Sequence, residues 1–372
     1  MKYPYSSIWI NGREVSLQHI LNDTAAAYDD FEKSTFRFIR QWLSDQHEFE
    51  LRTSGSTGPS KKIIITRDQM ISSAKATEKA LDLRPGFSAL TCLDTQYIAG
   101  QMMLVRSFTT GMKVLALTPS ANPFKQFNTL TPVDFTALVP YQVHAIVQSA
   151  EDAYFNSIKT IIIGGAAVEW ETRERLQRYH ALFFATYGMT ETISHIALQP
   201  LNGPDVPAYF QVLPGVTIQQ DNRGCLVIEA PHLVGKIVTN DLVELKNNTQ
   251  FKWLGRFDNI INSGGVKIIP EKIEAEVEKA FKRLNIHCNF FISSLPDSQL
   301  GERIILIIKE KIFTEGEQEK LYTTLQKTLS RYEIPKEVIT LASFNMTETG
   351  KLNRYSTRQN IDKSLQKFTF KK

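Results

Sequence analysis

The sequence predicts an α/β protein with a large N-terminal domain and a small α+β domain behind it. Between residues 68 and 186, apolar runs of strand length alternate with helical stretches, which predicts mostly parallel sheets covered by helices. Between residues 209 and 253 the apolar period falls toward two, which predicts an antiparallel section. After Arg256 the composition changes again. We therefore expect one domain over residues 1–257 and a second over residues 258–372.

The composition excludes several classes of protein. The chain has 372 residues, enough for two ordinary domains, with 42% hydrophobic and 22% charged residues, as in soluble globular proteins. A net charge of +4 is too small to predict nucleic-acid binding. Apolar runs such as 304–308 are too short to cross a membrane. We expect no nucleic-acid partner and no membrane span, and the oligomeric state is left open.

The cysteines and the N-terminal residues favour a cytoplasmic protein. Cys92, Cys225 and Cys288 lie far apart and have no metal-binding spacing, so we interpret them as reduced core residues. The first nine residues lack the basic segment and apolar run of a signal peptide.

The expected elements follow from the spacing of apolar residues. We expect helices at 31–43, 68–83, 100–109, 141–149 and 169–179, and strands at 49–52, 63–66, 89–93, 113–117, 135–139, 160–163 and 182–185. The antiparallel section has strands at 217–219, 225–229, 237–239 and 242–245. In the second domain Pro270 opens a helix with one apolar face, and strands at 289–293, 303–308 and 338–341 and a helix at 317–329 complete it.

A polar segment between two expected strands suits an anion. It reads Thr53-Ser54-Gly55-Ser56-Thr57-Gly58-Pro59-Ser60-Lys61. Glycines let backbone N–H groups turn toward a ligand, hydroxyls donate hydrogen bonds, and Lys61 adds positive charge. It is not a Walker loop, because Ser60 rather than glycine precedes the lysine. A flexible Ser/Gly linker is the alternative, but the flanking strands favour a tight loop.

Five further motifs have ordinary structural explanations when each is taken alone. They are Gly164-Gly165-Ala166, Tyr187-Gly188-Met189-Thr190-Glu191-Thr192, Thr239-Asn240-Asp241, the segment 255–268, and the segment 348–354. Glycines after a strand and Asn-Asp pairs usually form turns. A carboxylate at a helix start is stabilised by the helix dipole, and a lone lysine is usually a solvated surface charge.

In this order, the motifs resemble those of the acyl-adenylate-forming superfamily, which includes acyl-CoA synthetases, peptide-synthetase adenylation domains and luciferases. The loop at 53–61 is similar to T-S-G-[ST]-T-G-x-P-K, with Pro59 one position early, and residues 255–268 are similar to G-R-x-D-D-x-I-x-x-x-G-x-[KR]-I, with Asn259 replacing the second Asp. Asn240 replaces the glycine of the family's T-G-D. The resemblance covers residues 52–354, with fewer residues before the loop than is usual in the family. It implies an enzyme that adenylates a small carboxylic acid with ATP and Mg²⁺ and transfers the acyl group to coenzyme A.

The resemblance also implies a role for each matching residue. Catalytic roles fall to Lys351, Glu191, Thr190 and Lys61, with Glu191 holding Mg²⁺. Nucleotide binding falls to Thr53, Ser54, Gly55, Ser56, Thr57, Gly58, Gly165, Ala166, Tyr187, Gly188, Asp241 and Arg256. Asp258 would be the hinge of a mobile C-terminal domain, and Gly264 and Gly265 would face the thiol.

Within the superfamily, residues 97–103 and 187–197 are most similar to the o-succinylbenzoate–CoA ligases of menaquinone biosynthesis. That acid has a second carboxylate, which needs a cation or several donors, so we expect Arg106, Ser194 and His195 in the acid pocket, with Tyr97 lining it. The alternatives are that His195 is a satisfied structural residue or an i,i+4 partner of Glu191, and that Tyr97 is a core residue. The alternative functions are another aryl or fatty acyl-CoA ligase, an adenylation protein that loads a carrier-protein thiol, and a non-catalytic nucleotide-binding module.

Overall fold

The structure is a computed structural model that describes residues 3–44, 46–52, 62–126, 132–204, 206–346 and 352–370. The chain forms two compact units. The first contains Met1–Gln219, Val227–Ile237 and Leu245–Lys252, and the second contains Gln220–Leu226, Val238–Glu244 and Trp253–Lys372. The boundary expected between residues 257 and 258 stays a prediction, since the contacts also assign two earlier segments to the second unit.

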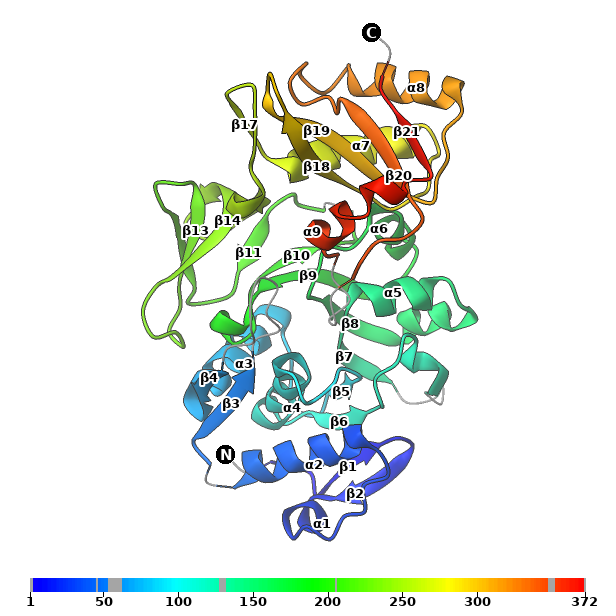
Figure 1. Cartoon of the computed structure of the whole chain (residues 1–372). Coiled ribbons are helices and arrows are strands. Elements are labelled where there is room, and N and C mark those ends of the chain that lie inside the picture. The colour runs from blue at the N-terminus through cyan, green and yellow to red at the C-terminus, as the bar shows by residue number, and fades with distance from the viewer. Residues whose placement is uncertain are drawn as a thin grey trace. The chain divides into compact units, whose positions relative to one another are not determined.

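A mixed sheet forms the centre of the first unit (Figure 1). Its parallel part has the spatial order β1 (Ser7–Ile10), β6 (Lys113–Ala116), β5 (Ser88–Thr91), β7 (Val133–Leu138), β8 (Ile158–Ile163) and β9 (Leu182–Gly188). Antiparallel strands continue it: β2 (Arg13–Ser16) beside β1, and β10 (His195–Pro200), β11 (Phe210–Val212) and β15 (Gln250–Arg256) beyond β9. The parallel strands therefore lie between two antiparallel margins.

Helices cover both faces of the parallel strands. The helices α2 (Asp30–Leu43), α3 (Arg67–Leu81) and α4 (Ile98–Thr110) share a core with Val114 and Ala116 of β6. The opposite core contains Leu115 and residues of α5 (Pro140–Val147), η2 (Ala150–Ser157) and α6 (Trp170–Leu176). Successive side chains of a strand point to opposite faces, so β6 is buried on both sides, as the apolar run 113–117 predicts.

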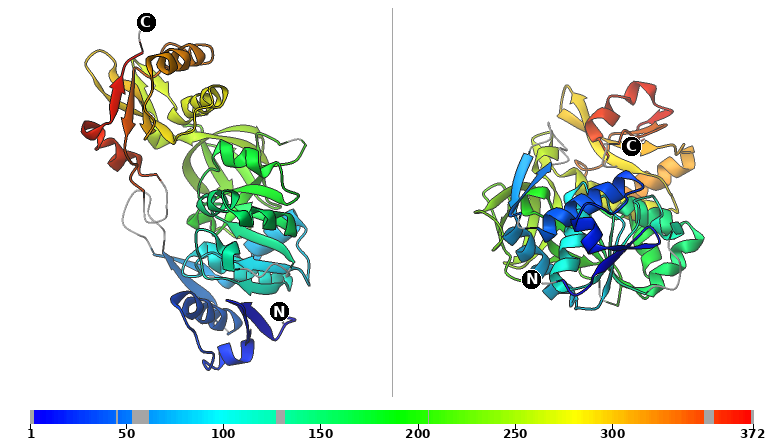
Figure 2. Two further views of the ribbon diagram at one scale, coloured as in Figure 1. Left: turned by 90° about the vertical axis from the view of Figure 1, so that its right-hand side faces the viewer. Right: turned by 90° about the horizontal axis from the view of Figure 1, so that it is seen from below.

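The N-terminal residues pack on the first of these cores. The hairpin β1–β2 leads into α1 (Leu17–Leu21) and lies beside α2, drawn in dark blue in Figure 2. Asp29 caps α2 by accepting a hydrogen bond from the backbone N–H of Glu32 at 2.7 Å. The strands β3 (Glu48–Arg52) and β4 (Lys62–Thr66) form a separate antiparallel pair that flanks residues 53–61.

The second unit has its own sheet and is an α+β structure. Its strands run in the order β17 (Val266–Ile268), β16 (Ile261–Ser263), β19 (Gly301–Lys309), β20 (Glu337–Leu341) and β21 (Gln366–Phe368), and β18 (Phe290–Asp297) also pairs with β19. One face packs against α7 (Pro270–Arg283) and α8 (Glu315–Leu325). The other face packs against η5 (Ile361–Lys363), which follows α9 (Arg354–Arg358).

The expected fold class is confirmed, but one detail of the antiparallel section is wrong. The strands β12 (Thr217–Gln220) and β13 (Cys225–Glu229) appear where expected. The strands expected at 237–239 and 242–245 are one continuous strand, β14 (Ile237–Asn247). Asn240 is not among the residues with positive φ. The motif Thr239-Asn240-Asp241 is therefore extended backbone rather than a turn, and its side chains alternate between the faces of the strand.

Candidate active site

The motif at 187–192 lies where β9 ends. Gly188 is needed there, because a Cβ atom at this position would come within 2.4 Å of the Cα atom of His195 on β10. The glycine thus lets the two antiparallel strands approach closely. The ring of Tyr187 lies in an aromatic cluster, with centroid distances of 5.0 Å to Phe251 and 6.0 Å to Phe210. Tyr187 is half-buried, so a planar edge of the cluster stays accessible to a ligand.

A short 3₁₀ turn, η3 (Thr190–Thr192), presents Thr190 and Glu191. Thr192 anchors the turn from inside: its hydroxyl accepts from the Met189 N–H at 2.9 Å and donates to the Ser194 carbonyl at 2.7 Å. Thr192 is buried, whereas Glu191 is exposed. The hydrogen-bonded turn therefore presents Glu191 at the surface, where a carboxylate can bind a hydrated cation.

Gly165 and Ala166 belong to the same edge of the sheet. They follow β8, which pairs in parallel with β9 up to Ile163 and Ala185, and both are exposed. Gly165 has a φ of +95°, which favours glycine. The carboxyl ends of neighbouring parallel strands meet at one edge, so the sequence motifs after β8 and β9 lie side by side, where ligands bind in such sheets.

Arg106 lies in a buried polar cluster with Ser194, His195 and Thr77. The Arg106 side chain is only 2% exposed and belongs to α4. Its Nη2 donates to the Ser194 Oγ at 2.6 Å and approaches the His195 Nδ1 at 3.4 Å, and its Nε donates to the Thr77 Oγ1 at 3.3 Å. In the part of the chain that the structure describes, no carboxylate is paired with this guanidinium. The three predicted acid-pocket residues Arg106, Ser194 and His195 are thus brought together.

The protonation states in this cluster follow from its burial. Because Nδ1 of His195 faces the guanidinium, it acts as the acceptor, and Nε2 carries the proton toward Thr77 Oγ1, 3.2 Å away. Burial and the positive charge of Arg106 hold the pKa of His195 well below its usual range, so the imidazole is neutral. Burial also lowers the pKa of Arg106 to about 9. The cluster therefore carries one positive charge in a nonpolar environment.

The structure also decides between the alternatives for Tyr97 and His195. Tyr97 is the N-cap residue of α4 and is 55% exposed, so it is not a core residue. The alternative that His195 is an i,i+4 helical partner of Glu191 is wrong. His195 starts the strand β10 and is buried, whereas Glu191 lies in a 3₁₀ turn and is exposed. Because no α-helix contains both residues, their spacing of four does not bring the side chains together.

The second unit places Asp241 beside Arg256. Asp241 is 6% exposed, and its Oδ1 accepts a hydrogen bond from Nε1 of Trp253 at 3.2 Å and lies 3.6 Å from Nη1 of Arg256. Nη2 of Arg256 in turn binds Asp258 Oδ2 at 3.0 Å. One arginine therefore bridges the residue predicted to bind ribose and the residue predicted to be the hinge.

Asn240 gives Asp258 a second partner. Its Nδ2 donates to both carboxylate oxygens of Asp258 at 3.2 Å, and its Oδ1 accepts from Nη1 of Arg223 at 2.9 Å. A glycine at position 240 offers none of these bonds. The departure from the family pattern at this position thus has a structural consequence.

Gly264 and Gly265 form the two-residue turn between β16 and β17. Ser263 pairs with Val266, and the two glycines have φ values of +59° and +81°. Positive φ at both central residues is the geometry of a type I′ hairpin turn. Both glycines are exposed, which leaves their backbone open to approach.

Part of the predicted site lies outside the described residues. These positions are Thr53, Ser54, Gly55, Ser56, Thr57, Gly58 and Lys61 of the loop, and Lys351. Their sequence neighbours are described: Arg52 pairs with Lys62 in β3–β4, and Met346 forms an antiparallel bridge with Leu352.

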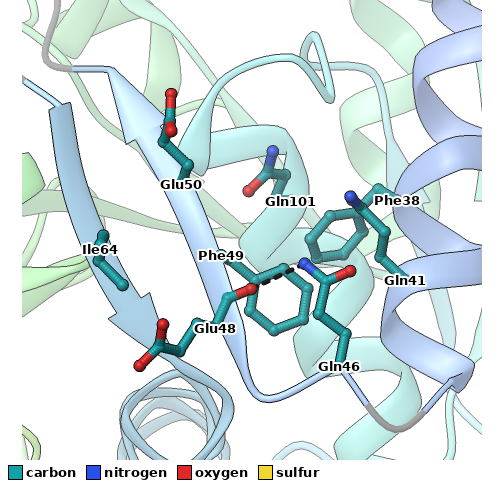
Figure 3. Close-up of a pocket in the computed structure, with 8 residues that line it drawn as sticks. All are labelled: Phe38, Gln41, Gln46, Glu48, Phe49, Glu50, Ile64 and Gln101. Atoms are coloured by element: carbon teal, nitrogen blue, oxygen red, sulfur yellow. Dashed lines mark hydrogen bonds between the residues drawn. The ribbon is translucent and has the colours of Figure 1, made fainter.

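A pocket of about 310 Å³ lies beside β3 and β4 (Figure 3). It is lined by Phe38, Gln41, Gln46, Glu48, Phe49, Glu50, Ile64 and Gln101. Figure 3 shows the amide of Gln46 donating to the carbonyl oxygen of Glu48, at 2.7 Å. Apart from Gln101, which shares α4 with Arg106, the lining contains no residue of the predicted motifs.

The described residues lack two features, a cluster of metal ligands and a membrane-spanning helix. They contain no group of three or more His, Cys, Asp or Glu side chains placed to hold a metal ion. Among the helices formed by these same residues, not one has both the length and the apolar character required to span a bilayer.

Sequence reasoning missed Thr77, Trp253 and Arg223. Thr77 lies on α3 and Trp253 on β15, and each resembles an ordinary core or surface residue in the sequence.

The fold agrees with comparisons to known proteins. Residues 51–240 match the family model described as "AMP-binding enzyme". A solved structure from Dyadobacter fermentans DSM 18053, an "acyl-CoA synthetase (AMP-forming)/AMP-acid ligase II-like protein", is 37% identical, with a TM-score of 0.62 over 92% of this chain and 97% of that chain. The chain therefore belongs to the AMP-binding enzyme family. The predicted enzyme class, an AMP-forming acid–CoA ligase, is confirmed, and enzymes of this class use ATP and coenzyme A.

More distant relatives include proteins with a named acid. The curated "2-succinylbenzoate--CoA ligase" of Bacillus cereus (strain AH820) is 23% identical over 360 residues, which cover 87% of this chain and 73% of that protein. The structure of o-succinylbenzoate CoA synthetase (MenE) from Bacillus subtilis with the acyl-adenylate OSB-AMP is 23% identical. Its TM-score is 0.67, over 82% of this chain and 68% of that chain. At this identity the structural likeness concerns the fold alone.

Proposed function

We propose that this enzyme activates o-succinylbenzoate with ATP and transfers the acyl group to coenzyme A, in menaquinone biosynthesis. The observation that carries the choice of acid is the buried guanidinium of Arg106, which has no paired carboxylate among the described residues. An isolated buried charge is costly, and natural proteins bury one when it is paired or binds a ligand. An acid with a second carboxylate supplies the missing partner.

The neighbours of Arg106 suit such a carboxylate. Ser194 remains partly exposed while its Oγ is bound to Arg106, so a ligand that reaches Ser194 also reaches the guanidinium. His195 is neutral and accepts from Arg106 and so leaves the positive charge of the cluster undivided. A planar guanidinium binds a carboxylate through two parallel hydrogen bonds, which adds geometric selectivity to charge.

The nucleotide would lie at the edge formed by the ends of β8 and β9. We assign the adenine to Tyr187, Gly188, Gly165 and Ala166, the phosphates to the loop at 53–58 with Lys61 and Thr190, and the ribose to Asp241 and Arg256. Asp241 suits two vicinal hydroxyls because a carboxylate offers two acceptor oxygens.

Glu191 would hold Mg²⁺. Its carboxylate is exposed and anchored by a rigid turn, and Mg²⁺ commonly takes one or two protein carboxylates together with phosphate oxygens and water. The bound ion supplies positive charge that reduces the repulsion between the acid and the nucleotide.

In the first step a carboxylate oxygen attacks the α-phosphorus of ATP, the bond to the β-phosphate oxygen breaks, and pyrophosphate leaves. In the second step the thiolate of coenzyme A attacks the acyl carbon, and the bond to the AMP oxygen breaks. We assign the first step to Lys351, which would neutralise charge on the two reacting anions, and the second to the backbone at Gly264 and Gly265. A rotation at Asp258 would withdraw Lys351 after the first step and bring Gly264 and Gly265 to the acyl-adenylate for the second. Removing one such preorganised charge typically lowers the rate by roughly 10²–10³-fold.

A panel of acids tests the proposal. Pyrophosphate release and thioester formation are measured with o-succinylbenzoate, benzoate and a medium-chain fatty acid. We expect kcat/KM to be at least about 10²-fold higher for o-succinylbenzoate, since the hydrogen-bonded charge partner is lost with the other acids. Equal or better turnover of a monocarboxylate, or transfer to a carrier-protein thiol but not to coenzyme A, contradicts the proposal.

A further inference from the structure

Helix α7 carries two carboxylates near its start, and they bind different parts of the second unit. Glu271 accepts a hydrogen bond from Nδ2 of Asn259, the residue after Asp258, at 2.5 Å. Glu274 binds both terminal nitrogens of Arg354: Nη1 lies 2.5 Å from Oε1 and Nη2 lies 2.9 Å from Oε2. Residues three apart lie on the same face of a helix. One face of α7 therefore joins the turn at Asp258 to the start of α9.

The Glu274–Arg354 pair is also tied to β18. Oε1 of Glu274 accepts from the Ile292 N–H at 2.8 Å, and Nη1 of Arg354 donates to the Ile292 carbonyl at 3.3 Å. The side chains of Arg354 and Glu274 are 31% and 18% exposed. A bidentate pair of this kind fixes direction as well as distance, because both forks are planar.

The chain on either side of residues 347–351 is held by described contacts. Met346 and Leu352 form a bridge, and the Asn353 N–H donates to the Asn345 carbonyl at 2.8 Å. The side chain of Asn353 caps α9 by accepting from the Ser356 N–H at 3.0 Å. Arg354, the first residue of α9, then attaches this arrangement to α7. Lys351 directly precedes Leu352 in the sequence, three residues before Arg354.

We propose that Glu274 and Arg354 are positioning residues for the adenylation step: they attach the chain directly after Lys351, from Leu352 to Arg354, to α7, and α7 attaches it to the turn at Asp258. The proposal rests on the function proposed above for Lys351. Catalysis by a point charge depends on its placement, and a shift of about 1 Å can lower the rate about 10²-fold. The thioester step does not use Lys351 in this scheme and so does not depend on the pair.

The test compares two half-reactions in full-length variants. Acid-dependent ATP–pyrophosphate exchange measures adenylation, and conversion of supplied acyl-adenylate with coenzyme A measures thioester formation. The variants are Arg354→Met and Glu274→Gln, and the latter can still accept from the Ile292 N–H. Arg303→Met is the matched control, because Arg303 binds Glu337 at 3.2 Å in the same unit with side-chain exposures of 34% and 17%, joining β19 to β20.

We expect both positioning variants to lower adenylation by about 10²-fold while thioester formation stays within about twofold, and Arg303→Met to change the two rates equally or not at all. The double variant should be no slower than the slower single variant, since both changes break the same pair. Arg354→Lys, which keeps charge but not the fork, should fall between Arg354→Met and the unaltered enzyme.

A parallel loss of both half-reactions, with a lower melting temperature in all variants, would show a purely structural pair and overturn the inference. Lys351→Ala separates this failure from failure of the proposed function. If Lys351→Ala loses adenylation selectively but Arg354→Met and Glu274→Gln do not, only the positioning role is refuted. If Lys351→Ala itself slows both steps equally, the role proposed for Lys351 is wrong.

Discussion

Replacing Arg106 by methionine should separate substrate recognition from stability. Methionine keeps an unbranched apolar stem and removes the charge from a side chain that is only 2% exposed. The lost contacts are the hydrogen bonds to Ser194 at 2.6 Å and Thr77 at 3.3 Å, and the approach to His195 at 3.4 Å. Ser194 is partly exposed and can bind water instead.

Arg106→Met should leave the stability of the fold unchanged or raise it, but should weaken binding of the acid. Because Arg106 is buried without a paired carboxylate among the described residues, its removal relieves a desolvation cost. The free energy of unfolding should stay within about 1 kcal/mol of the original value or rise. Binding of a second substrate carboxylate loses a charged hydrogen-bond partner worth about 2–3 kcal/mol, which corresponds to a rise in KM of roughly 30- to 150-fold.

Steady-state kinetics with three acids measure the effect on acid binding. The acids are o-succinylbenzoate and two analogues that each lack one of its two carboxylates. Arg106→Met should raise KM for o-succinylbenzoate and leave kcat/KM unchanged for whichever analogue keeps the reactive carboxylate. Chemical denaturation measures the effect on the free energy of unfolding. An equal loss of kcat/KM for all accepted acids, or a large loss of stability without a change in acid preference, would show that Arg106 does not bind the second carboxylate.

Three further substitutions test other parts of the site. Glu191→Gln should raise the Mg²⁺ concentration needed for half-maximal pyrophosphate release by about tenfold or more, because the ion loses a carboxylate ligand. An unchanged Mg²⁺ dependence contradicts the role of Glu191. Asp241→Asn keeps one acceptor oxygen and should raise KM for ATP about tenfold with little change in KM for the acid; the opposite pattern would place Asp241 elsewhere. Burial and Arg106 hold the pKa of His195 well below 6.5, so below pH 6.5 the unfolded chain binds a proton that the folded chain does not. The free energy of unfolding is therefore unaffected by this group above pH 6.5 and falls by about 1.4 kcal/mol per pH unit below it. Denaturation of the original chain and of His195→Gln should therefore show a shallower pH dependence for the variant below pH 6.5, and identical slopes would contradict the buried neutral imidazole.

The sequence predicts the parallel part of the fold well because burial on both faces leaves a strong pattern. The run at 113–117 becomes β6, whose alternate residues enter two different cores. The helix expected at 31–43 is α2, from Asp30 to Leu43. Local residue preferences fail at Asn240. The sequence alone suggests a turn there, but the strand β14 continues through this residue.

The candidate site is predictable where a motif contains its own chemistry. Glu191 and Gly165 lie at the sheet edge at which such motifs are expected, and Arg106 meets Ser194 and His195, which follow it by 88 and 89 residues. Their partners are not predictable in the same way. Thr77 and Trp253 act through contacts between separate elements, and nothing in their local sequence distinguishes them from other threonines and tryptophans.

In the proposed mechanism the carboxylate becomes bonded to the α-phosphorus of ATP before the thiol reacts, and isotope transfer detects this bond. The enzyme is supplied with ATP, coenzyme A and o-succinylbenzoate labelled with ¹⁸O in its carboxylates. Attack of a carboxylate oxygen on the α-phosphorus leaves one labelled oxygen on AMP when the thioester forms. We predict one ¹⁸O atom per AMP, detected by mass spectrometry or ³¹P NMR. Unlabelled AMP, or label in inorganic phosphate with release of ADP, would contradict the mechanism.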